Sequence, residues 1–291
     1  MAQLIASTDN PCGELENGNI LFFKEIPFEF PQEEINFLLM QKQGSAGGRK
    51  NIAYKPQIDR VTNHQSGNPA ERERLHQILR NYSQRVTSFL STFLAPYAAR
   101  WSHDYASFRP FQEKGRKLRL RARNDLLHVD AFPTRPTDGA RILRFFTNIN
   151  PTEPRIWNTS TPFSELVDQF LGTKGFPVLR SYSHFPFARF FRTLLRIRSP
   201  YDAFMLRMHH FMKENEQFQK ECPKDRWEFP PLSCWAVFTD QVSHAALAGQ
   251  YALEQTFLIP RSALLSPELS PIGILERIAK ATLTSEHPLN G

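Results

Sequence analysis

The chain has 291 residues, of which 41% are hydrophobic and 22% charged, an ordinary globular composition that excludes whole-chain disorder, collagen and coiled coil. Its net charge is +7, and residues 109–144 hold eight Arg and two Lys against four acids, a surplus of +6. Because Arg binds carboxylates and phosphates in a bidentate manner, this distribution indicates an anionic ligand, although nucleic acid would also fit.

Cysteine spacing and hydropathy indicate the cellular compartment in which the protein works. Cys12, Cys222 and Cys234 are an odd number without a CxxC spacing, so neither a disulfide framework nor a zinc–thiolate site is expected. The N-terminal residues lack the basic and apolar regions of a signal peptide, and no window is apolar enough to span a membrane. We therefore expect a protein of the cytosol, or one bound to a membrane from its cytosolic side.

The first hundred residues predict a mostly helical N-terminal support. Residues 19–28 favour a strand, and a short helix follows that begins with Pro31. Residues 70–94 form the clearest helix of the chain, because apolar side chains recur at helical spacing and Pro96 lies just past the end.

From Trp101 onward the pattern favours strands. Short alternating runs are separated by Pro, Thr, Asp and Gly, namely SFRPF, KLRLRAR, DLLHVDAF, RILRFFTNIN, SCWAVFTDQVSHAAL and QYALEQTFLIP. Helices are expected at residues 163–171, 204–219 and 275–282. The chain therefore predicts an antiparallel β core with helices before and inside it, most simply one α+β domain.

The motif His128-Val129-Asp130 carries the first chemical signal. Alternate side chains of a strand share a face, so His128 and Asp130 point the same way. A third ligand is available in His244, on a predicted strand late in the chain. Two His and one carboxylate match the facial triad of non-haem iron(II) oxygenases, which leaves positions open for a 2-oxo acid and O₂. The alternative is a strand histidine hydrogen-bonded beside an ordinary aspartate.

A 2-oxoglutarate enzyme needs a cation for the distal carboxylate of this cosubstrate. Residues 245–260, which follow the distal histidine, contain neither Arg nor Lys. Arg109, Arg144 and Arg155 lie around the metal motif instead, and arginines of this kind clamp a dicarboxylate bidentately. The alternative for each is a solvated face.

Several segments together resemble the 3-deoxy-D-manno-oct-2-ulosonic acid (Kdo) 3-hydroxylase family over nearly the whole chain. They are FRPF, HVDAFPTRPTDGARILRFFTNINPTEPRIW, MLRMHHFMK and TDQVSHAALAGQYALEQTFLIP. The resemblance implies a double-stranded β-helix (jelly-roll) core with N-terminal and inserted helices, as a single oxygenase domain over residues 1–291. It also implies an Fe(II)-, 2-oxoglutarate- and O₂-dependent dioxygenase that hydroxylates C3 of Kdo on a lipopolysaccharide (Kdo-lipid A) precursor. The product would be D-glycero-D-talo-oct-2-ulosonic acid.

The same resemblance assigns roles to residues. It makes His128, Asp130 and His244 the iron ligands, and Arg109, Arg144, Arg155 and Trp157 the group that holds 2-oxoglutarate, without ranking the arginines. It also implies a histidine near the metal in MLRMHHFMK, where His209 is favoured over His210 as a catalytic residue in oxygen activation.

The implied partner is a Kdo-bearing lipid A precursor, met at the cytoplasmic face of the bacterial inner membrane by a peripheral enzyme, with no nucleic acid expected. Arg119, Arg121 and Arg123 would share one strand face and receive phosphates or carboxylates, or else form a charged sheet edge. Residues 187–196 would form a basic amphipathic helix for the membrane interface, or else a helix packed on the core.

Two other functions stay open at this stage. One is a 2-oxoglutarate oxygenase that acts on a different anionic substrate. The other is a non-catalytic jelly-roll binding module that uses its basic face, with the HxD motif incidental. The second predicts steep salt dependence of binding and no effect of losing His128.

Overall fold

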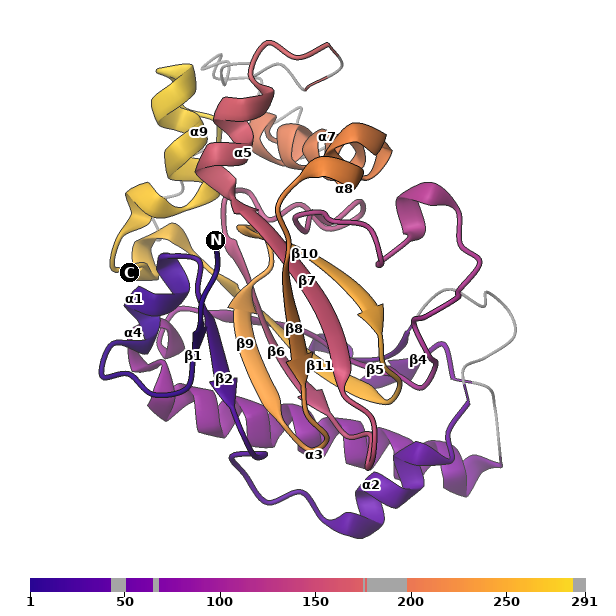
Figure 1. The fold of residues 1–291 in the computed structure, drawn as a ribbon. Coiled ribbons are helices and arrows are strands. Elements are labelled where there is room, and N and C mark those ends of the chain that lie inside the picture. Colours follow the sequence, from indigo (N-terminus) through magenta and orange to yellow (C-terminus); the bar gives the residue numbers. More distant parts are fainter. Residues whose placement is uncertain (43–50, 65–67, 175, 177–197, 285–291) are drawn as a thin grey trace.

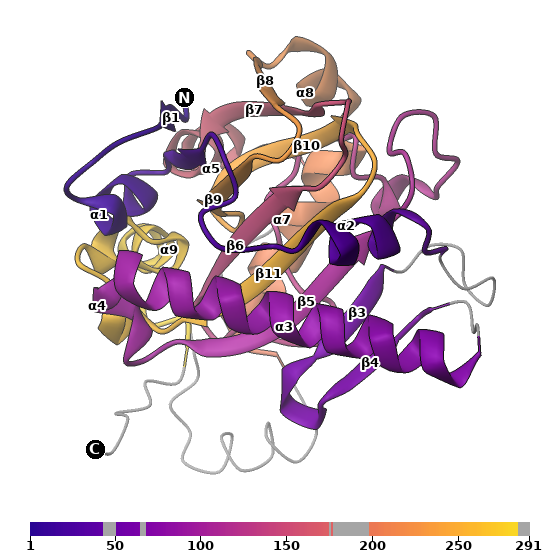
Figure 2. The same cartoon turned by 90° about the horizontal axis from the view of Figure 1, so that it is seen from below.

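The computed structural model describes residues 1–42, 51–64, 68–174, 176 and 198–284. Two β-sheets lie at its centre, and a long helix, α3 (Pro69–Phe93), runs below them (Figure 1). A group of helices gathers at the opposite end of the sheets. Seen from below, α3 crosses the outer side of the larger sheet (Figure 2).

The larger sheet has eight strands in the order β1-β2-β9-β6-β11-β5-β3-β4. Their bounds are β1 (Leu4–Ile5), β2 (Ile20–Phe23), β3 (Ile52–Lys55), β4 (Arg60–Thr62), β5 (Ser102–Arg109), β6 (Arg141–Asn148), β9 (Cys234–Phe238) and β11 (Ala252–Ile259). The smaller sheet has the order β10-β7-β8, with β7 (Arg155–Pro162), β8 (Asp225–Phe229) and β10 (Val242–Ala248). Apart from the parallel pair β1–β2, the neighbouring strands are antiparallel.

The chain passes repeatedly from one sheet to the other. β6 lies in the larger sheet and β7 in the smaller one, β8 returns to β9, and β10 lies in the smaller sheet between β9 and β11 of the larger. Crossings of this kind wrap two sheets around one interior, which is the jelly-roll arrangement. The expected α+β fold with a jelly-roll core is therefore confirmed.

Eight helices belong to the described residues. Besides α3 they are α1 (Pro11–Glu16), α2 (Gln32–Leu39), α4 (Ala95–Ala98), α5 (Phe163–Phe170), α7 (Pro200–Glu214), α8 (Glu216–Glu221) and α9 (Pro271–Ala279). The helix expected at 70–94 is α3, and the one expected after Pro31 is α2.

Helix α3 is stabilised by a capped N-terminus and by an apolar face that packs on the sheet. The Asn68 side chain accepts a hydrogen bond from the Glu71 N–H at 2.8 Å, and Pro69 occupies the first turn. Its buried apolar residues share one core with β5, β6, β9 and β11. The same face makes a buried hydrogen bond to the sheet, between the hydroxyl groups of Tyr82 and Thr147 on β6, 3.1 Å apart. α3 thus covers the outer face of the larger sheet.

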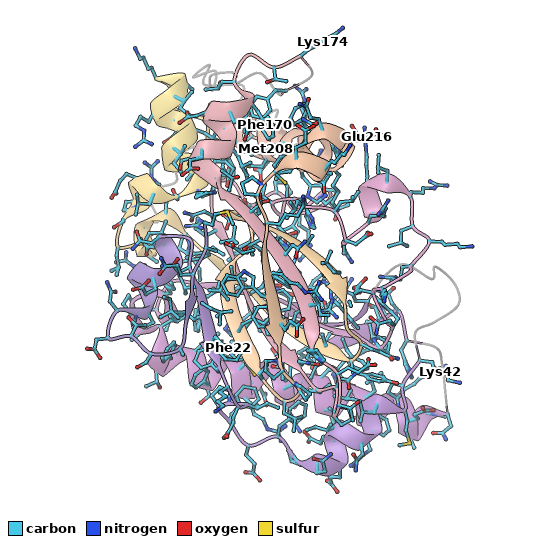
Figure 3. The ribbon with its side chains drawn as sticks, in the orientation of Figure 1. Phe22, Lys42, Phe170, Lys174, Met208 and Glu216 are labelled. Carbon is cyan, nitrogen blue, oxygen red and sulfur yellow. The ribbon has the colours of Figure 1, made fainter. Side chains whose placement is uncertain are left out.

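A second core lies among the helices at the other end. Phe170 of α5 and Met208 of α7 are buried there together with apolar residues of α9 (Figure 3). Leu127 and Val129, which flank His128, belong to the same core. The side chains of Leu127 and Val129 thus anchor the segment around His128 to the helical layer.

Two expected elements are each divided by a break. Residues 233–247, read as one strand, form β9 and β10 with a turn between them, where the Gln241 N–H donates to the Phe238 carbonyl at 3.1 Å. The helix expected at 204–219 is two helices, because Asn215 leaves the helical conformation and caps α8 by accepting from the Phe218 N–H at 3.0 Å.

The strand expected at KLRLRAR is wrong. The segment is a loop with one 3₁₀ turn at Leu120–Ala122, and Leu120 is 46% exposed. Leu118 is only partly buried, and two of the arginines pair with acids: Arg121 with Glu214 at 2.5 Å and Arg123 with Asp125 at 2.6 Å. The expected common face of three arginines does not exist.

The basic amphipathic helix expected at 187–196 lies outside the described residues. Within the described part, none of the helices combines the length and the hydropathy that a membrane span requires.

A buried ion pair stabilises the turn before the distal histidine. Arg141 is fully buried, its Nε donates to Asp240 Oδ2 at 2.8 Å, and its guanidinium stacks 3.8 Å from the Phe238 ring centroid. Arg141→Leu leaves Asp240 unpaired, so we expect a loss of about 3–5 kcal/mol in the free energy of unfolding, measured in urea. Arg226→Leu, which breaks the exposed pair with Glu228, should change it little. Equal losses in the two variants would contradict this assignment.

Candidate active site

All eight residues predicted to form the site line one cavity of about 250 Å³. They are Arg109, His128, Asp130, Arg144, Arg155, Trp157, His209 and His244. They come from the larger sheet, the smaller sheet, helix α7 and the segment around His128, so only the folded chain brings them together. Phe146, Asn124, Arg121 and Lys213 complete much of the wall.

The segment with His128 lies at the edge of the smaller sheet. The His128 N–H donates to the His244 carbonyl at 3.1 Å, and the His244 N–H donates back to the His128 carbonyl at 2.9 Å. The Asp130 N–H donates to the Thr239 carbonyl at 2.7 Å. His128 and Asp130 are therefore held on one side of an extended segment, directly beside His244 on β10.

Three histidine rings are oriented in the same way. Nδ1 of His128 lies 2.7 Å from the Leu126 carbonyl, Nδ1 of His244 lies 2.8 Å from that of Val242, and Nδ1 of His209 lies 2.8 Å from that of Val129. A carbonyl only accepts, so each Nδ1 carries the proton and each Nε2 keeps its lone pair. This tautomer is the one that a metal ligand needs.

The ligand atoms converge in the cavity. One atom each of His128, Asp130 and His209 lie within 4.8 Å of one another. The ring centroid of His128 is 4.7 Å from that of His244 and 4.9 Å from that of His209. His209 thus stands beside the predicted triad, whereas His210 does not line the cavity.

The charge state of these groups suits a metal. Burial lowers the pKa of His128 and of His244, and lowers that of His209 to about 4, so the rings are neutral at pH 7. Burial by itself would raise the pKa of Asp130, but the Arg144 guanidinium, 3.0 Å away, holds it well below its usual range. Neutral imidazoles and one carboxylate are a donor set that fits iron(II) with open positions.

The three arginines differ in how fully they are paired. Arg109 Nη2 lies 2.6 Å from Glu254, and Arg144 lies 2.7 Å from Glu254 and 3.0 Å from Asp130. Arg155 has a longer contact of 3.3 Å with Glu113 and a bond of 3.2 Å to the Gly249 carbonyl. Arg155 is therefore the least compensated of the three.

Two buried donors point to an acidic ligand near Arg155. Nε of Arg155 and Nε1 of Trp157 are buried without a hydrogen-bond partner among the described residues. Nε of Arg144, in the same cavity, also lacks a well-aligned hydrogen bond but lies 3.0 Å from Asp130. Burial lowers the pKa of Arg155 to about 10, although Glu113 favours the charged form. Buried donors of native proteins are normally satisfied, so these two fit the far carboxylate of a dicarboxylate cosubstrate.

The β10–β11 turn needs a glycine because it lies against Arg155. Gly249 has a φ of +113°, and a Cβ there would approach the Arg155 Cα to 2.9 Å. The close approach brings the Gly249 carbonyl to the guanidinium and fixes its direction.

Sequence reasoning missed three charged residues of this region. Glu113 and Glu254 neutralise the arginines, and Lys213 lines the cavity one helical turn after His209. The signals were visible: Glu254 interrupts the apolar run ALEQTFLI, and Lys213 is four residues from His209, on the same helix face.

Comparisons with known proteins agree with this geometry. A family model for 3-deoxy-D-manno-oct-2-ulosonic acid (Kdo) hydroxylase matches residues 3–282. The apo structure of the Kdo hydroxylase KdoO, a non-haem Fe(II) alpha-ketoglutarate-dependent dioxygenase, is similar with a TM-score of 0.85 and 33% identity over 100% of both chains. KdoO with alpha-ketoglutarate and Fe(III) gives 0.84 and 33% over 100% of both, and KdoO with cobalt(II) gives 0.84 and 34% over 99% of both. No curated protein sequence matches the chain. With a family match over almost its entire length, this chain belongs to the Kdo hydroxylase family.

Proposed function

We propose that this enzyme, an Fe(II)- and 2-oxoglutarate-dependent dioxygenase by family, hydroxylates C3 of Kdo on a Kdo-lipid A precursor. The product would be D-glycero-D-talo-oct-2-ulosonic acid. The observation that carries the proposal is the cavity in which the HxD pair, two further histidines and an undercompensated arginine meet.

In this proposal His128, Asp130 and His244 hold the iron. When bound, iron with 2-oxoglutarate and O₂ supplies the oxidation that inserts one oxygen atom into a C–H bond while 2-oxoglutarate becomes succinate and CO₂. The chain contributes orientation, because each Nδ1–H is fixed by a carbonyl and Asp130 by Arg144.

Arg155 and Trp157 bind the far carboxylate of 2-oxoglutarate through their free N–H groups. Arg109 and Arg144 also line the cavity, but both form ion pairs with Glu254, so their role is to support the binding site and not to bind the carboxylate directly. The ring of Trp157 also stacks on His244, with centroids 5.0 Å apart and planes inclined by 20°. One side chain thereby links the cosubstrate end of the cavity to the metal end.

A cavity of about 250 Å³ is smaller than most ligand pockets, which supports binding of the sugar without its lipid. In this proposal the acyl chains of the substrate stay outside the cavity, and the enzyme works against the cytoplasmic face of the membrane that holds them. The net charge of +7 favours contact with an anionic surface.

A matched pair of histidines tests the role of the residue beside the metal. His209→Ala removes a ring whose Nε2 faces the ligand atoms, so we expect turnover to fall roughly 10- to 100-fold with iron retained. His210→Ala removes the neighbouring ring, which lies outside the cavity, and should leave turnover unchanged. Succinate formation and iron content measure both. Equal losses from the two variants would show that the helix, not the ring, matters.

Mass spectrometry tests the function itself. Purified protein with Fe(II), ascorbate and 2-oxoglutarate should add one oxygen atom to Kdo-lipid A precursor, and fragmentation should place it at C3. If succinate forms without oxygen addition, the enzyme class stands and the substrate is another anion. Addition at a different carbon would overturn the assignment of C3.

A further inference from the structure

Lys213 is a buried lysine to which the proposed function gives no role. It lies on α7 four residues after His209, so both side chains occupy the same face of the helix. Its exposed fraction is 4%, and it lines the cavity together with His209 and His128. Lysines are almost never this buried without a partner.

The ammonium group is only partly satisfied. Its one hydrogen bond goes to the Arg121 carbonyl at 3.2 Å. Among the described residues no carboxylate forms an ion pair with Nζ within 4.0 Å. The two acids that act on Lys213 are paired with other residues, Asp130 with Arg144 and Asp125 with Arg123. An ammonium has three donors, so donors remain for a ligand in the cavity.

Electrostatics agree with this geometry. Burial lowers the pKa of Lys213 to about 8, although Asp130 and Asp125 favour the charged form. A charge buried with so little compensation is costly unless a ligand pairs with it. Cationic groups from different elements therefore line the cavity, among them Arg155 of β7 and Lys213 of α7.

We propose that the Lys213 ammonium binds the C1 carboxylate of the sugar acid and thereby fixes which carbon faces the metal. This rests on the proposed function, and it adds the group that recognises the acid. One helical turn, about 5.4 Å, separates Lys213 from His209. Because both side chains line the same cavity, an anionic group held by Lys213 lies near the reacting carbon, and in Kdo the carboxylate carbon C1 is two bonds from C3.

The test measures binding without turnover. Anaerobic protein loaded with Fe(II) and 2-oxoglutarate is titrated calorimetrically with the methyl glycoside of Kdo, as the free acid and as its methyl ester. Hydrogen bonds to charged groups predict that the wild type prefers the acid by about ten- to a hundredfold. Lys213→Met should bind acid and ester equally weakly. Arg207→Met, which removes an exposed charge from the same helix, should keep the preference.

A second variant separates charge from structure. Lys213→Gln keeps an N–H donor for the Arg121 carbonyl but loses the charge, so it too should lose the preference for the acid. If it keeps the preference, Lys213 only holds the loop and the proposal is wrong. The absorbance of bound Fe(II) with 2-oxoglutarate checks that each variant retains a folded site. A wild type that binds neither ligand would instead overturn Kdo as the substrate.

Discussion

His128→Ala and His244→Ala are expected to abolish stoichiometric iron binding and to reduce succinate formation by well over about a hundredfold. Loss of groups that merely orient metal ligands costs roughly 10- to 100-fold, and loss of a ligand costs more. Both rings present Nε2 to the cavity because a backbone carbonyl occupies Nδ1. Iron content after gel filtration, and succinate formed per minute, measure the two effects.

The control is His103→Ala, an exposed histidine of β5 outside the cavity, which should keep its iron and its turnover. The same measurement decides which ring completes the triad. His209→Ala should retain iron while His244→Ala loses it. The reverse result would make His209 the third ligand, a role that its position within 4.8 Å of the other ligand atoms also allows.

Arg155→Met is expected to raise the KM for 2-oxoglutarate about a hundredfold or more and to change kcat much less at saturating cosubstrate. Truncating one partner of a buried hydrogen-bonded charge pair costs about 2–5 kcal/mol, and each 1.4 kcal/mol is tenfold in affinity. The fold should tolerate the change, because Glu113 keeps Arg109 at 3.5 Å and Arg116 at 3.2 Å as partners. Steady-state succinate formation against 2-oxoglutarate concentration gives both constants.

Arg109→Met provides the matched comparison, because Arg109 lines the same cavity as Arg155. Arg109 is already bound to Glu254, so its loss should raise the KM less than the loss of Arg155 does. A larger effect at Arg109 would show that the cosubstrate displaces Glu254 and would move the anchor to the larger sheet.

Strand periodicity and motif spacing selected His128, Asp130 and His244, which the structure brings together in one cavity. The strand expected at DLLHVDAF is an extended segment with a single bridge, from His128 to His244, and not a full strand. His128 and Asp130 still line one cavity, because side chains alternate along any extended backbone, and His244 lies directly opposite His128. Arg109, Arg144 and Arg155 line the same cavity.

The same local rule failed for KLRLRAR. Alternation of leucine and arginine predicts a strand only if another strand and an apolar surface lie beside it. Here the neighbours are Glu214 of α7 and Asp125, so ion pairs and a 3₁₀ turn prevail. The missing information was which elements, distant in sequence, lie against the segment.

The sequence by itself determined three things: the family, the β-rich core after residue 100 and the residue types of the candidate site. Those features are carried by short-range patterns and by motif matches. The tertiary structure alone decided how charges are shared: Glu254 occupies Arg109 and Arg144, Arg155 keeps free donors, and Lys213 has no acid beside it in the described part of the chain. Pairing of buried charges depends on distances of 3–4 Å between strands and helices far apart in sequence, which no local pattern encodes.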